Sequence, residues 1–142
     1  MCEGIYIGSI ATAIDSEALT THRIRAIINL SGVSYVSSIP VYQIDMDDTE
    51  VTDITLSEYM SKFAEGIRAI NEAREQNYNV LVHCAAGINR SATLIGLYMI
   101  SEGHQHKDVI DALQHANCSR GVAVLTNPTF RAILRQAARG DI

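Results

Sequence analysis

The sequence predicts an α/β protein in which helices flank a small central sheet, mixed or parallel. Apolar runs of strand length alternate with helical patterns up to residue 84, and helical patterns alone follow. The chain has 142 residues, which is enough to bury one core and favours a single domain spanning residues 1–142.

The first part of the chain supplies three predicted strands. Residues 4–8 ("GIYIG") form a short strand that ends at glycine, residues 24–31 form a buried strand, and residues 41–46 form a third strand after Pro40. Between the first two strands, Asp15 is placed to cap a short helix. A polar loop rich in aspartate and glutamate follows the third strand.

The rest of the chain alternates a long helix, a buried strand and more helices. Apolar residues from Leu56 to Ile70 recur every three or four positions, which predicts a helix with a capping box formed by Thr55 and Glu58. The continuous apolar run over residues 79–84 is typical of a strand inside a sheet. Apolar periodicity and end signals, including Gly103, Asn127 and Pro128, predict three further helices over residues 91–103, 106–116 and 127–138.

Composition and charge exclude several classes of protein. The net charge is -5 and the pI about 5.4, so a whole-surface interaction with nucleic acid or anionic membrane is not expected. The three cysteines, Cys2, Cys84 and Cys118, show no C-x-x-C spacing, which argues against a disulfide framework or a zinc site and favours a reducing compartment. Neither a signal peptide nor a membrane-spanning run is visible, so we expect a cytoplasmic protein.

The segment "HCAAGINRS" between the buried strand and the next helix carries the candidate chemistry. The start of a helix at the carboxyl end of a strand offers unpaired backbone N–H groups that suit an anion, and small residues around Gly87 keep that loop tight. The planar guanidinium of Arg90 suits two phosphate oxygens. The helix start and Arg90 are expected to hold the pKa of the Cys84 thiol below its free value of ~8.5, giving a thiolate able to attack phosphorus.

Two neighbours of this loop have expected supporting roles. The Ser91 hydroxyl is placed to bond the cysteine sulfur and ease its departure, and His83 is placed to orient the loop through its ring nitrogens. A cysteine at the end of a central strand is more often a small buried hydrophobic residue, but neither Cys2 nor Cys118 has an arginine six positions later.

"VHCAAGINRS" resembles the H-C-x-x-G-x-x-R-S signature of cysteine-dependent protein phosphatases, and the chain resembles most closely the poxvirus-type members of the dual-specificity branch. The segments "IYIGSIATA", "DDTEVTDI" and "RGVAVLTNPTF" extend the similarity over nearly the whole chain. The resemblance implies that Cys84 is the nucleophile and that Arg90 binds phosphate. It implies a phosphate cradle made by the backbone of Ala85, Ala86, Gly87, Ile88, Asn89 and Arg90. Arg120 resembles a family arginine near the pocket, although a surface or structural role fits it equally well.

A general acid is needed to protonate the leaving oxygen, and such a group typically raises the reaction rate ~10²–10⁴-fold. The acid-rich loop after residue 46 is the expected source, and the resemblance points to the aspartate directly after the strand. Counting toward Asp53 favours Asp48, whereas matching "DDT" to the poxvirus-type loop favours Asp47, because this loop is slightly longer than the family's. Asp48 is our prediction, with Asp47 as the alternative.

The predicted function is a dual-specificity protein phosphatase that acts on phosphotyrosine and on phosphoserine or phosphothreonine through a cysteinyl-phosphate, with no cofactor and no metal. The expected partner is a phosphorylated protein. An RNA 5′-phosphatase of the same superfamily and a phospho-binding pseudophosphatase remain as alternatives. Poxvirus-type relatives exchange an N-terminal helix in a dimer; this chain starts almost at its first strand, so we expect no dimer of that kind and leave the oligomeric state open.

Overall fold

The computed structural model describes residues 4–46, 53–85, 90–116 and 128–139. Within these residues, four strands form one sheet in the order β1-β4-β2-β3, and all neighbouring pairs are parallel. Of the two predicted arrangements, mixed and parallel, the sheet therefore has the parallel one. The strands are β1 (Ile5–Gly8), β2 (Ile24–Asn29), β3 (Val41–Gln43) and β4 (Asn79–His83).

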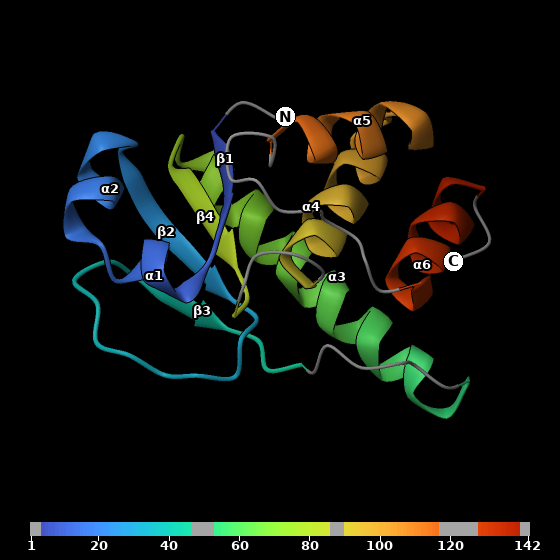
Figure 1. Cartoon of the computed structure of the whole chain (residues 1–142), viewed down its shortest axis with the longest axis horizontal. Coiled ribbons are helices and arrows are strands. Elements are labelled where there is room, and N and C mark those ends of the chain that lie inside the picture. Colours follow the sequence, from blue (N-terminus) through green and yellow to red (C-terminus); the bar gives the residue numbers. More distant parts are fainter. Residues whose placement is uncertain (1–3, 47–52, 86–89, 117–127, 140–142) are drawn as a thin grey trace.

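Helices cover both faces of this sheet (Figure 1). Two short helices lie on one face, where Ala13 and Leu19 pack against Ile27 and Leu81 of the sheet. Four longer helices lie on the other face, over the larger apolar core. The helices are α1 (Ile10–Ala13), α2 (Ser16–Thr21), α3 (Asp53–Glu75), α4 (Arg90–Ser101), α5 (His106–Ala116) and α6 (Pro128–Ala138). Among the described helices, none combines the length and apolar character needed to cross a membrane.

Helix α4 is the centre of the larger layer, and every residue from Arg90 to Met99 is buried. Its neighbours approach closely because glycine stands at two contact points. A Cβ atom on Gly66 of α3 would lie 2.8 Å from the Leu94 side chain, and one on Gly96 of α4 would lie 2.8 Å from the Leu134 side chain. The sheet, α3 and α6 therefore hold α4 in a fixed position.

Several end signals are confirmed. The carboxylate of Asp15 accepts hydrogen bonds from the backbone N–H groups of Glu17 at 3.1 Å and Ala18 at 3.2 Å, as a helix N-cap does. Gly103 follows α4 with a positive φ of 97°, which glycine adopts without strain. Pro128 opens α6, whereas Asn127 lies outside the described residues.

Two predictions about the elements are wrong, and one helix was not predicted. Helix α3 begins at Asp53, so Thr55 lies inside its first turn and cannot be its N-cap. Strand β3 ends at Gln43 rather than at residue 46, because its partner strand β2 ends at Asn29, which pairs with Gln43. The backbone carbonyls of Asp45 and Met46 accept hydrogen bonds from the Lys62 and Arg90 side chains instead. The four-residue helix α1 was not expected.

Strand register brings four strand ends into one row. Gly8 pairs with His83, His83 pairs with Asn29, and Asn29 pairs with Gln43. These residues are the last of β1, β4, β2 and β3. The segments that follow them therefore meet at the carboxyl edge of the sheet, where ligands bind in open α/β folds.

Candidate active site

Cys84 lies directly after β4, at the centre of this carboxyl edge. Its side chain is 2% exposed, and its Sγ lies 3.4 Å from Oγ of Ser91, a fully buried residue in the first turn of α4. The predicted contact between these two residues is thus present. The next residue, Ala85, is fixed from the other side of the edge, because its carbonyl accepts the backbone N–H of Ile10 in α1 at 3.3 Å.

Arg90 is the first residue of α4 and lies in the protein interior, with 9% of its surface exposed. Its Nη1 donates to the carbonyl oxygen of Leu30 at 3.2 Å and to that of Met46 at 2.8 Å. Its Nε is buried and finds no hydrogen-bond partner in the part of the chain that is described. An unsatisfied buried donor on a charged group is costly, so this N–H calls for an acceptor beyond the described residues.

His83 holds the backbone of the candidate nucleophile. Its side chain is fully buried, its Nδ1 lies 3.1 Å from the Cys84 carbonyl oxygen, and its Nε2 lies 2.8 Å from the Tyr35 hydroxyl. Burial is the main influence on the pKa of His83 and lowers it, the bond to the Cys84 carbonyl raises it, and the nearby Arg90 charge lowers it again. The net lowering keeps the ring neutral at physiological pH.

The neutral ring has one possible arrangement of protons. A carbonyl oxygen only accepts, so Nδ1 carries the hydrogen and donates to Cys84, and Nε2 accepts from the Tyr35 hydroxyl. Burial raises the pKa of Tyr35 to about 12, so this hydroxyl keeps its proton at neutral pH. The chain of bonds therefore runs from Tyr35 through His83 to the carbonyl of Cys84.

A second polar cluster shapes the turn after β2, which carries the Leu30 carbonyl that Arg90 binds. The side-chain oxygen of Asn29, which is fully buried, accepts the backbone N–H of Ser31 at 2.9 Å and its hydroxyl at 2.6 Å. The Asn29 amide donates to the Val33 carbonyl at 2.7 Å. This asparagine turn keeps the chain beside Arg90 in one conformation.

The described residues bring together four of the predicted site residues, namely Cys84, Ala85, Arg90 and Ser91. The remaining predicted residues lie outside the described part of the chain: Asp47, Asp48, Ala86, Gly87, Ile88, Asn89 and Arg120.

Sequence reasoning missed the contributions of Tyr35 and Asn29. The Asn-Leu-Ser triplet at the end of β2 is a recognisable side-chain turn signal for Asn29. No local pattern distinguishes Tyr35, which lies 48 residues from its partner His83.

An α/β fold with a cysteine and an arginine at one strand–helix junction defines a class, the cysteine-dependent phosphatases. The family description "Dual specificity phosphatase, catalytic domain" matches residues 5–139. The chain therefore belongs to the dual-specificity phosphatase family and is an enzyme of the protein-tyrosine and dual-specificity phosphatase class. The resemblance seen in the sequence is thereby confirmed.

Individual relatives agree with this assignment. The vaccinia virus (strain Copenhagen) dual specificity protein phosphatase OPG106 is 29% identical over 133 residues, which cover 89% of this chain and 74% of the relative. Mouse dual specificity protein phosphatase 22 is 33% identical over 106 residues, covering 69% of this chain and 52% of the relative. The crystal structure of DUSP15 matches with a TM-score of 0.80 at 29% identity and covers 99% of this chain and 86% of that one.

Proposed function

We propose that the protein hydrolyses phosphotyrosine and phosphoserine or phosphothreonine in protein substrates, through a cysteinyl-phosphate formed on Cys84. The observation that carries this proposal is the junction of β4 and α4. There a buried sulfur lies at the start of a helix whose first residue, Arg90, has a buried Nε donor that finds no partner among the described residues. The helix start and the guanidinium both favour an ionised sulfur and a bound phosphate dianion.

The first chemical step forms the sulfur–phosphorus bond. The Cys84 thiolate attacks phosphorus in line with the ester oxygen, and the phosphorus–oxygen ester bond breaks. The alkoxide or phenoxide leaving group takes a proton from Asp48, the predicted general acid, with Asp47 as the alternative. Arg90 and the backbone N–H groups of residues 85–90 would stabilise the equatorial oxygens during transfer.

The second step returns the enzyme to its starting state. The aspartate, now ionised, takes a proton from water as the water oxygen attacks phosphorus, and the sulfur–phosphorus bond breaks. The Ser91 hydroxyl, 3.4 Å from the sulfur, is positioned to donate a hydrogen bond to the departing thiolate. Inorganic phosphate leaves, and the proton held by the aspartate serves the next cycle.

The decisive experiment compares wild type with Cys84→Ser on p-nitrophenyl phosphate. We expect turnover by wild type alone, while circular dichroism and thermal unfolding show that the variant folds. Turnover by neither protein would contradict the proposed chemistry and would support a protein that only binds phosphorylated partners.

Substrate class is tested separately with three peptides of one sequence that carry phosphotyrosine, phosphoserine or phosphothreonine, beside an RNA with a 5′-triphosphate. We expect release of phosphate from all three peptides. Preference for the RNA by kcat/KM would overturn the assignment of protein substrates.

A further inference from the structure

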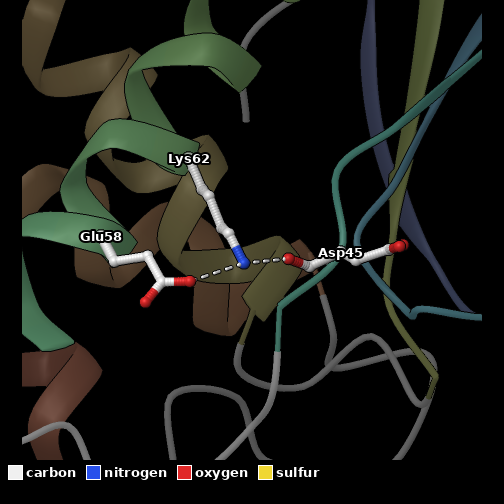
Figure 2. A network of polar contacts seen from close by, with 3 residues as sticks. All are labelled: Asp45, Glu58 and Lys62. Atoms are coloured by element: carbon white, nitrogen blue, oxygen red, sulfur yellow. Dashed lines mark hydrogen bonds and ion pairs between the residues drawn. The ribbon is translucent and has the colours of Figure 1, made fainter.

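Lys62 of α3 makes a contact that links two distant parts of the chain. Its Nζ donates to the backbone carbonyl oxygen of Asp45 at 2.6 Å, across a sequence separation of 17 residues, and also lies 3.4 Å from Oε1 of Glu58 (Figure 2). The ion pair with Glu58 is of the ordinary helical kind between residues four apart. The bond to the Asp45 carbonyl is different, because it fixes main chain that belongs to another element.

The carbonyl that Lys62 binds is next to one that Arg90 binds. Arg90 donates to the carbonyl of Met46 at 2.8 Å, so cations from α3 and α4 hold two consecutive peptide groups. The side chain of Asp45 is also held, since it accepts from the amide of Gln43 at 2.9 Å. Side chains therefore fix Asp45 and Met46, the segment after β3, although the strand itself has ended.

This fixed segment ends where the predicted acid begins. Asp47 directly follows Met46 in the sequence, and Asp48 is the next residue. At most one residue therefore separates Met46, whose carbonyl Arg90 binds, from either candidate acid in the sequence. We infer that Lys62 is a positioning residue that fixes the backbone from which the general acid reaches the leaving group; this inference rests on the proposed function.

The surroundings of Lys62 favour positioning over a direct effect of its charge. A cation close to a general acid favours the ionised carboxylate, which cannot protonate a leaving group. The Glu58 carboxylate offsets this charge, and the Lys62 side chain is 33% exposed, so water screens the remainder. A small misplacement of a catalytic group strongly lowers the rate of the reaction. The exposed ion pair between Lys62 and Glu58, in contrast, contributes little to the stability of the fold.

The test uses substrates that differ in their need for an acid. Phenyl phosphate releases a phenol whose pKa is close to that of tyrosine, ~10, and therefore needs protonation. p-Nitrophenyl phosphate releases a stabilised anion and needs little help. For Lys62→Met we expect kcat/KM, which reports the first step alone, to fall about 10-fold on phenyl phosphate and less than about 2-fold on p-nitrophenyl phosphate, which is a partial loss of the acid's contribution.

Matched variants make this result specific. Lys62→Arg can still donate to the Asp45 carbonyl, and we expect it to recover most of the activity on phenyl phosphate. Lys107→Met changes an exposed lysine of α5 and is expected to match wild type on both substrates. The rate of Cys84 alkylation by iodoacetamide as a function of pH should be the same in Lys62→Met and wild type, since the nucleophile is unaffected.

Each outcome separates this inference from the proposed function. Asp47→Asn and Asp48→Asn are measured in parallel, and one of them should show the same substrate dependence with a larger loss. If one does while kcat/KM of Lys62→Met falls equally on both substrates, or on neither, the positioning role of Lys62 is refuted and the acid stands. If neither aspartate variant shows it, the assignment of the acid fails, and the role of Lys62 fails with it.

Discussion

Replacing Tyr35 by phenylalanine removes one hydroxyl group and retains the aromatic ring. The ring of Tyr35 lies with its centroid 5.7 Å from that of His83, so the packing between them is expected to persist. What disappears is the 2.8 Å hydrogen bond to Nε2 of His83, a side chain that is fully buried.

The magnitude follows from this burial. A buried acceptor left without a donor costs about 1–3 kcal/mol, so the free energy of unfolding should fall by an amount in that range. Urea unfolding followed by circular dichroism measures it. Tyr42→Phe is the matched control. Tyr42 lies on β3 and is 37% exposed, so removing its hydroxyl should change the free energy of unfolding by no more than about 0.5 kcal/mol.

A second measurement tests the link to the nucleophile. Without the tyrosine hydroxyl, Nε2 of His83 loses its donor, and only the bond from Nδ1 to the Cys84 carbonyl still orients the ring. We expect alkylation of Cys84 to require a higher pH in Tyr35→Phe than in wild type. Equal unfolding free energies and equal alkylation profiles for Tyr35→Phe and Tyr42→Phe would refute the reasoning.

Three further predictions follow from buried groups. Burial and the Arg90 charge lower the pKa of His83, so below about pH 6.5 the unfolded chain binds a proton that the folded chain does not. The free energy of unfolding should therefore fall as the pH drops below about 6.5. Urea unfolding at several pH values should show a weaker dependence on pH for His83→Asn than for wild type. Arg90→Lys keeps the charge but loses the planar fork, so kcat on p-nitrophenyl phosphate should fall about 100-fold; an unchanged kcat would exclude Arg90 from phosphate binding. Gly96→Ala places a Cβ 2.8 Å from Leu134 and 3.3 Å from Val109, which should destabilise the protein by about 1–3 kcal/mol, whereas a stabilised variant would show that this contact relaxes freely.

The local elements could be predicted because they depend on patterns of nearby residues. The apolar run before Cys84 identified the central strand, and Asp15, Gly103 and Pro128 marked helix ends as the structure has them. The capping box at Thr55 failed because a capping pattern inside a longer helix looks the same in the sequence as one at its start. The roles of Asp48, Asp47 and Arg120 stay predictions.

The sequence by itself determined the alternation of strands and helices and the placing of Cys84 and Arg90 at the two ends of one short loop, because both depend on residues that are neighbours in the chain. Only the tertiary structure decided which distant groups come together at the carboxyl edge of the sheet. Tyr35 reaches His83, Arg90 reaches the carbonyls of Leu30 and Met46, and Lys62 reaches Asp45. The physical reason is the strand order β1-β4-β2-β3, which brings the ends of β2, β3 and β4 to one edge, and no local periodicity records that order.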